Sequence, residues 1–191
     1  MSGVLVVDHY DSYTYNLVHL VGSVTGRLPD VRQHDDPRAA ATWRDYSHVV
    51  LSPGPGTVCE QSDFALGREV IADSTRPVLG VCLGMQGIVH VLGGDVGVVE
   101  PAHGERALVR HSGEGVFASI PQDFTVVRYH SQAATAVPAC LRETAWCDGP
   151  QGPVVMGVQH VDRPLHGVQF HPESVLTEHG ATLMRNFLAL T

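Results

Sequence analysis

The segment Val78-Leu79-Gly80-Val81-Cys82-Leu83-Gly84 decides the fold of this chain. The segment begins with a short apolar run. After the segment, apolar residues recur at helical spacing from Met85 to Leu92, and Gly93-Gly94 follows them. This pattern predicts a buried strand, a sharp turn at Cys82 and a helix. Such a turn needs small neighbours, because the backbones of the strand and the helix pass close together. We therefore expect an α/β fold in which the Cys82 side chain projects from the edge of a sheet.

The predicted turn brings the Cys82 thiol close to the first free N–H groups of a helix. Those donors and the helix dipole favour negative charge, so they lower the pKa of a thiol and can hold an oxyanion. Cys82 is therefore a candidate nucleophile. The alternative is that Cys82 is a small buried hydrophobic residue, which is the commonest role of a free cysteine. The turn alone does not separate the two, because glycine-rich strand–helix turns are common in α/β proteins.

Strands and helices alternate through the first half of the chain. This alternation predicts a mostly parallel sheet covered on both faces, with ligands bound at the carboxyl ends of the strands. Cys82 and the rigid segment Pro53-Gly54-Pro55-Gly56 both fall at such ends. The strands are expected at 4–7, 31–34, 48–52 and around Val78, and the main helices at 15–21, 62–73 and 85–92.

The second half of the chain has a different pattern, with short strands separated by turns. Some of these strands are expected to be antiparallel, and they are predicted at 96–99, 107–109, 124–127, 143–147, 154–159 and 164–170. An amphipathic helix over 178–190 closes the chain. No linker or repeat divides the sequence, so we predict one domain over residues 1–191.

Composition narrows the classes of function. The chain has 191 residues and a net charge of −8, and it has no basic run, which argues against a nucleic-acid partner. No stretch approaches the roughly 20 apolar residues that a membrane span needs, and we expect a cytoplasmic protein. The four cysteines (Cys59, Cys82, Cys140, Cys147) and twelve histidines lack the spacing of metal ligands, so no metal site is predicted.

A second reactive cluster, His171-Pro172-Glu173, directly follows the predicted strand that ends at Phe170. In extended backbone, residues two apart point to the same side, so His171 and Glu173 can lie together. A glutamate beside an imidazole raises its basicity, and the imidazole can then take a proton from Cys82 and later deliver it. The alternative is an ordinary loop in which Glu173 is simply solvated.

Five ordered segments give the chain a more specific likeness. It resembles the class I glutamine amidotransferases, which use a catalytic triad, and among them the glutaminase subunits or domains of aminodeoxychorismate synthase and anthranilate synthase. The resemblance covers essentially all 191 residues. The segments that carry it are Asp8-x-Tyr10-Asp11-Ser12-x-Thr14-x-Asn16, Ser52-Pro53-Gly54-Pro55-Gly56, Gly80-Val81-Cys82-Leu83-Gly84-x-Gln86, Tyr129-His130-Ser131 and Gly167-Val168-Gln169-Phe170-His171-Pro172-Glu173-Ser174.

The resemblance implies a role for each matching residue. Cys82 would be the nucleophile, His171 its base and acid, and Glu173 the carboxylate that orients the imidazole. The oxyanion hole would use the N–H groups of Leu83 and Gly56. L-Glutamine would bind against Gly54, Pro55, Gly56, Leu83, Gln86, Ser131 and Gln132, with Gln86 and the Ser131 segment holding its α-amino and α-carboxylate groups.

The resemblance also implies a partner. The family passes ammonia directly to a synthase that aminates chorismate. The resemblance implies no cofactor in this chain, whereas the synthase would use Mg²⁺. The segments Val137–Trp146 and Met156-Gly157-Val158 favour aminodeoxychorismate synthase over anthranilate synthase. The chain can be a free subunit or one domain of a fused synthase.

Four positions depart from the family pattern without removing a member of the triad. The family usually has histidine where this chain has Met85, lysine at Glu105, leucine at Gln132 and proline at Val58. Met85 is expected to change packing, whereas Glu105 reverses a charge on a segment that the family places near its partner. Two other classes of function stay open: a stand-alone cysteine hydrolase or γ-glutamyl peptidase, and a non-catalytic regulatory subunit.

Overall fold

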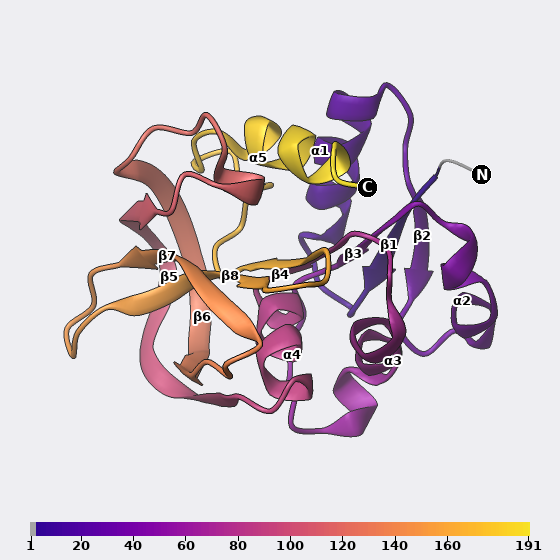
Figure 1. Ribbon diagram of the computed structural model, residues 1–191, viewed down its shortest axis with the longest axis horizontal. Helices are drawn as coiled ribbons and strands as arrows, with labels where there is room; N and C mark the ends of the chain where they lie inside the picture. Colours follow the sequence, from indigo (N-terminus) through magenta and orange to yellow (C-terminus); the bar gives the residue numbers. More distant parts are fainter. Residues whose placement is uncertain (1–2) are drawn as a thin grey trace.

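The computed structural model describes residues 3–191, which form one α/β unit around a mixed sheet (Figure 1). The nine strands lie in the order β2-β1-β3-β4-β9-β8-β7-β5-β6. The pairs from β2 to β9 are parallel, and the pairs from β9 to β6 are antiparallel. The strands are β1 (Val4–Asp8), β2 (Asp30–Gln33), β3 (His48–Leu51), β4 (Val78–Val81), β5 (Asp95–His111), β6 (Phe124–Ala136), β7 (Leu141–Cys147), β8 (Val154–His160) and β9 (Leu165–Val168). The predicted fold class is therefore confirmed.

Helices cover both faces of the parallel part of the sheet. Helices α1 (Thr14–Thr25) and α5 (Gly180–Leu188) lie side by side on one face (Figure 1). On the other face are α2 (Pro37–Thr42), α3 (Ala65–Asp73) and α4 (Leu83–Val91). No helix within residues 3–191 has both the length and the apolar character to cross a membrane.

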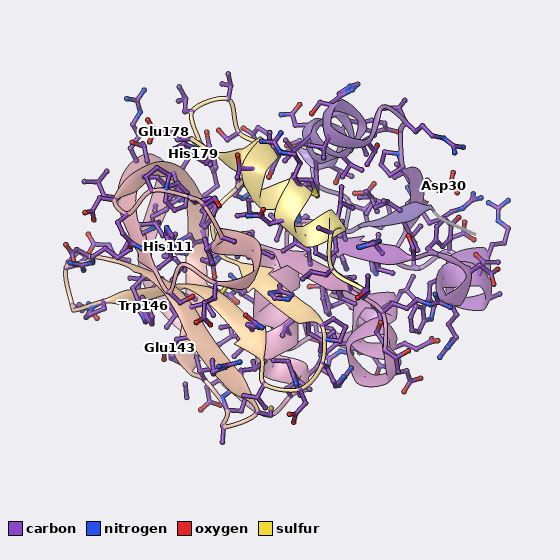
Figure 2. All side chains as sticks on the ribbon, turned by 45° about the horizontal axis from the view of Figure 1, so that its top comes forward. Asp30, His111, Glu143, Trp146, Glu178 and His179 are labelled. Carbon is purple, nitrogen blue, oxygen red and sulfur yellow. The ribbon has the colours of Figure 1, made fainter. Side chains whose placement is uncertain are left out.

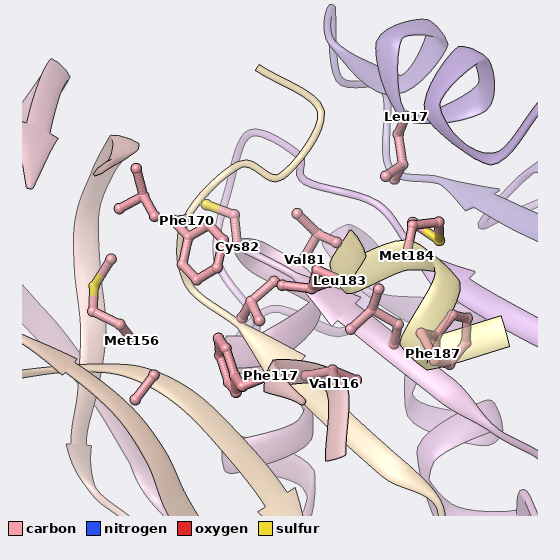
Figure 3. Packing of buried hydrophobic residues seen from close by; sticks show 14 of the residues in the cluster. Leu17, Val81, Cys82, Val116, Phe117, Met156, Phe170, Leu183, Met184 and Phe187 are labelled. Carbon is pink, nitrogen blue, oxygen red and sulfur yellow. The ribbon is translucent and has the colours of Figure 1, made fainter. Parts of the chain in front are cut away.

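The apolar runs of the central strands divide between two cores. In β1, Leu5 and Val7 belong to the cluster under α2, α3 and α4, whereas Val6 belongs to the cluster under α1 and α5. Successive residues of a strand point to opposite faces, so a strand with helices on both sides must be apolar throughout. Cys82 and Phe170 both belong to the cluster under α1 and α5 (Figure 3).

The antiparallel half corrects one sequence prediction. The segments 96–99 and 107–109 are not separate strands but parts of the 17-residue strand β5, which pairs with β6. Pro101 and Gly104 resemble turn residues in the sequence, but here they fall beside irregularities of the pairing, between Val98 and Ala102 and between His103 and Glu105. A β-bulge absorbs such residues and bends the strand without ending it.

Two helix boundaries also differ from the predictions. Helix α3 begins at Ala65 rather than at Ser62, because a short 3₁₀ turn over Gln61–Asp63 precedes it. Helix α5 spans Gly180–Leu188 rather than 178–190, and it follows His179 in a left-handed conformation. Residues 169–179 are consequently left as a connection between β9 and α5, and this connection carries His171 and Glu173.

Candidate active site

Cys82 occupies the sharp turn between β4 and α4. Its backbone has φ +52° and ψ −101°, a conformation that a residue with a side chain rarely adopts. A Cβ atom at Gly80 would collide with the backbone of Gly84, and one at Gly84 would collide with Leu51 on β3. The glycines on both sides of Cys82 are therefore needed for the close approach of strand and helix, as the sequence predicted.

His171 and Glu173 lie together just beyond the carboxyl end of β9. The Nδ1 atom of His171 is 2.6 Å from Oε1 of Glu173, and the two side chains are only 4% and 0% exposed. The connection that carries them is tied to β6, because the backbone N–H of Thr125 donates to the Glu178 carboxylate at 2.7 Å. Figure 2 labels Glu178 and the neighbouring His179, on the segment that directly precedes α5. These contacts hold the His171 segment in place.

The surroundings of His171 raise the pKa of its imidazole to about 10. Burial by itself lowers the pKa, but the Cys82 sulfur and the Glu173 carboxylate both stabilise the protonated ring and outweigh it. Among residues 3–191, no group accepts or donates a hydrogen bond at the buried Nε2 atom of His171. This nitrogen is thus available to exchange a proton with the neighbouring sulfur.

A cavity of about 160 Å³ opens in front of Cys82. All the residues predicted to contact the substrate line it, and the cavity brings together three parts of the fold: the loop after β3, the start of α4 and the middle of β6. Its walls are Gly54, Pro55, Gly56, Cys82, Leu83, Gln86, Tyr129, His130, Ser131 and Gln132. Tyr129 and His130 were not predicted as contacts, although their position beside Ser131 is a sequence signal that they share this wall.

The loop after β3 is held from both sides at Thr57. The Thr57 N–H donates to Oδ2 of Asp63 at 3.1 Å, and the Thr57 hydroxyl donates to Oε1 of Gln132 at 3.3 Å. Gly56 has φ +89°, and a Cβ atom there would collide with the Asp63 carboxylate. Only glycine therefore fits at the position predicted to donate to an oxyanion.

Two glutamines connect the Cys82 sulfur to the cavity wall. Gln169, which is fully buried, donates from Nε2 to the Cys82 sulfur at 3.5 Å. Gln86 donates to the Gln169 side chain at 3.3 Å and to the Gln132 carbonyl at 2.8 Å. Sequence reasoning assigned no role to Gln169, although a polar side chain two residues before His171 in a buried strand was a signal.

The four departures from the family pattern lie in different surroundings. Met85 and Val58 are fully buried in the core under α3 and α4. Glu105 is exposed on β5, opposite Arg128 of β6. Gln132 lines the cavity. Across residues 3–191, no group of three or more His, Cys, Asp or Glu side chains is arranged to hold a metal ion.

Comparison with known proteins places this arrangement in a family. Residues 5–190 match the family described as class-I glutamine amidotransferase. An aminodeoxychorismate synthase of Streptomyces griseus is 47% identical, over 98% of this chain and 26% of the relative, so the chain spans about a quarter of that protein. An anthranilate synthase component 2 of Halobacterium salinarum is 45% identical, over 97% of this chain and 96% of the relative.

A solved structure shares the fold. The crystal structure of a candidate GMP synthase component from Thermoplasma acidophilum superimposes with a TM-score of 0.85 at 24% identity, covering 98% of this chain and 92% of that one. The family match, which extends over almost the whole chain, agrees with the elbow at Cys82 and the adjoining His171–Glu173 pair. The chain belongs to the class I glutamine amidotransferase family.

Proposed function

We propose that this chain hydrolyses L-glutamine to glutamate and ammonia, with Cys82, His171 and Glu173 as its catalytic triad. One observation carries the proposal: Cys82 opens on a small polar cavity in front, while the His171–Glu173 pair flanks its sulfur. This arrangement supports the roles of nucleophile for Cys82, of base for His171 and of orienting group for Glu173.

The triad would act in two stages. His171 Nε2 holds the proton that comes from Cys82, in keeping with its raised pKa, and the thiolate attacks the carboxamide carbon of glutamine to give a tetrahedral oxyanion. When this collapses, the C–N bond breaks, and His171 returns the proton to the departing nitrogen, so that ammonia leaves. His171 then deprotonates a water molecule, which attacks the thioester and releases glutamate with the thiol restored. Glu173 keeps the imidazole oriented throughout.

The cavity walls would bind the rest of the substrate. The backbone N–H groups of Leu83, at the start of α4, and Gly56 would stabilise the oxyanion. Both N–H bonds of the Gln86 amide are engaged by Gln132 and Gln169, which leaves its oxygen to accept from the α-ammonium group. The Ser131 segment would hold the α-carboxylate.

We further propose that the ammonia passes to a chorismate-aminating synthase, which would be the subunit that uses Mg²⁺. A groove of about 510 Å³ adjoins the catalytic residues, because Glu173 and Tyr129 line it together with exposed Val175 and Leu176. Val175 is 96% exposed. Apolar side chains beside an active site are suited to a docked protein, and such a partner would shield the ammonia from bulk water.

Aminodeoxychorismate synthase is the preferred partner, and anthranilate synthase is the alternative. The name of the Streptomyces griseus relative supports the first, and the name of the Halobacterium salinarum relative supports the second. The Val137–Trp146 and Met156–Val158 segments favour the first. The deciding experiment is to isolate the chain from its native cell, identify the chorismate enzyme that accompanies it, and identify the aminated product.

The glutaminase itself is tested with the purified chain and its Cys82→Ser variant, with Cys140→Ser as the matched control. We expect release of glutamate and ammonia from L-glutamine by the parent and the control, and none by Cys82→Ser. In the complex, Cys82→Ser should still allow amination when ammonia is added at high pH. Turnover of γ-glutamyl peptides but not of glutamine would favour a peptidase instead, and full activity of Cys82→Ser would refute the proposal.

A further inference from the structure

We propose that Gln169 is a positioning residue that stabilises the Cys82 thiolate, and that hydrogen bonds running from the Gln132 carbonyl through Gln86 fix its orientation. The inference rests on the proposed role of Cys82 as the nucleophile. Gln169 has no exposed surface, and its Nε2 atom lies 3.5 Å from the Cys82 sulfur. The question is which end of its amide faces the sulfur, because only the NH₂ end can stabilise a thiolate.

Arg128 fixes the tautomer of His130, which is the second donor to the Gln132 carbonyl. A guanidinium group can only donate, and Nε of Arg128 lies 3.1 Å from Nε2 of His130. This nitrogen of His130 must therefore accept, so the ring carries its proton on Nδ1. That proton is donated to the Gln132 carbonyl at 3.0 Å. Burial, and then the charge of Arg128, lower the pKa of His130 to about 4, which keeps the ring neutral.

The Gln132 carbonyl then fixes the next two amides. A carbonyl oxygen only accepts, so the atom of Gln86 that lies 2.8 Å from it must be the NH₂ nitrogen. The same nitrogen lies 3.3 Å from the Gln169 side chain, which must present its oxygen. The remaining end of the Gln169 amide, its NH₂ group, consequently faces Cys82. The reverse orientation would place two donors against each other at Gln86 and an oxygen against the sulfur.

This arrangement explains why a glutamine is retained in a fully buried position. Leaving a buried amide without partners is costly, and here its oxygen has Gln86 and its nitrogen has the sulfur. When His171 removes the thiol proton, the bond from Gln169 becomes a charge-assisted hydrogen bond, which is about twice as strong as a neutral one. The Gln169 amide thus favours the thiolate without lining the cavity that would hold glutamine.

The test measures the pH dependence of Cys82 alkylation by iodoacetamide, with peptide mass mapping to separate Cys82 from Cys59, Cys140 and Cys147. Gln169→Met removes the donor at similar volume, and Gln169→Glu replaces it with a carboxylate. Gln159→Met is the matched control, because Gln159 lies on the adjoining strand β8, opposite His166, and does not line the cavity at Cys82.

We expect the alkylation midpoint of Gln169→Met to rise by about one pH unit, since a hydrogen bond to a charged group changes a pKa by that order. Gln169→Glu should raise the midpoint further, and Gln159→Met should leave it unchanged. On the acidic side of the midpoint, kcat/KM for glutamine should fall about tenfold in Gln169→Met, with KM nearly constant. Thermal unfolding of each variant identifies any loss that is merely structural.

Two results would overturn the inference. One is an unchanged midpoint in both folded Gln169 variants. The other is a KM that rises in proportion to the loss of kcat/KM, which would indicate a substrate contact instead. If Gln169→Met does not fold, Gln169→Glu, which keeps the shape of the side chain, still gives the midpoint. A full glutaminase activity in Cys82→Ser would instead refute the proposed function, so the two failures are distinguishable.

Discussion

Nδ1 of His171 lies 2.6 Å from Oε1 of Glu173, and both side chains are almost fully shielded from solvent. A charge-assisted contact of this kind is strong where water does not compete for it. It orients the imidazole so that its other nitrogen is left for Cys82. It also stabilises the protonated ring, so it helps to hold the pKa of His171 near 10.

Replacing Glu173 by glutamine should therefore change both the rate and its pH dependence. The substitution removes a charge that raises the pKa of His171, so the alkaline limb of kcat/KM should move to lower pH. The rate itself should fall about 10²–10⁴-fold, the usual contribution of positioned acid–base catalysis. Glu114→Gln is the control, because this carboxylate is exposed and lies outside the cavity at Cys82. A Glu173→Gln profile that coincides with the parent would contradict the assigned role.

Gly56→Ala should disable the oxyanion loop while leaving the triad intact. A side chain at φ +89° is strained, and its Cβ atom would push against the Asp63 carboxylate that holds Thr57. Loss of one oxyanion donor costs about 10²–10³ in kcat. Gly26→Ala separates strain from catalysis, since Gly26 has φ +74° at the end of α1 with open space around it. We expect Gly26→Ala to lower the melting temperature but not kcat.

The sequence was sufficient to predict the parallel half of the fold. Apolar runs such as Val4–Val7, separated by helical periods, specify buried strands wherever helices cover both faces. In the antiparallel half, Pro101 and Gly104 interrupt the pattern of β5, and local sequence does not reveal that pairing with β6 continues past them. Long-range pairing overrides the local signal there, so the sequence alone divided one strand into two.

The sequence also predicted the part of the candidate site that short motifs specify, but not the part that depends on long-range pairing. Cys82, His171 and Glu173 stand in motifs whose geometry follows from short segments, namely a turn and an i, i+2 spacing. The contact between Gln169 and Cys82 joins residues that are 87 positions apart, and it depends on how β4 and β9 pair. No short pattern carries that information. The catalytic roles of all these residues stay predictions until the variants are measured.

Three buried histidines should make the fold sensitive to acid. The pKa values of His9, His130 and His166 are lowered to about 3, 4 and 4, in each case chiefly by burial. Below pH 6.5 the unfolded chain binds protons that the folded chain does not, so stability falls with pH by about 1.4 kcal/mol per unit and per group. His171 does not offset this, because a raised pKa gives its full stabilisation below pH 6.5 and loses it only toward pH 10.

Chemical denaturation at pH 7.0, 6.0 and 5.0 measures this loss. The His166→Leu variant should show a shallower pH dependence than the parent, because it removes one of the three neutral histidines. His19→Ala, at an exposed position on α1, should leave the dependence as it is. Equal slopes for the parent and His166→Leu would mean that His166 is protonated in the folded chain.

The isolated chain should hydrolyse glutamine slowly and its complex with a synthase should do so much faster. A glutaminase without an acceptor wastes glutamine, and the loop held at Thr57 by Asp63 and Gln132 is a place where docking can turn the Gly56 N–H toward the oxyanion. Glu105 lies close to this site. It is exposed, and it follows Gly104, which lies next to the ring of Tyr129 in the cavity wall.

Glu105→Lys should therefore change how strongly the synthase activates the chain, without altering kcat/KM of the isolated chain. Glu114→Lys, beyond the far end of β5, should change neither the activation nor kcat/KM of the isolated chain. The measurement is kcat/KM for glutamine with and without the synthase, and an isolated chain that already matches the complex would mean that the loop is preformed.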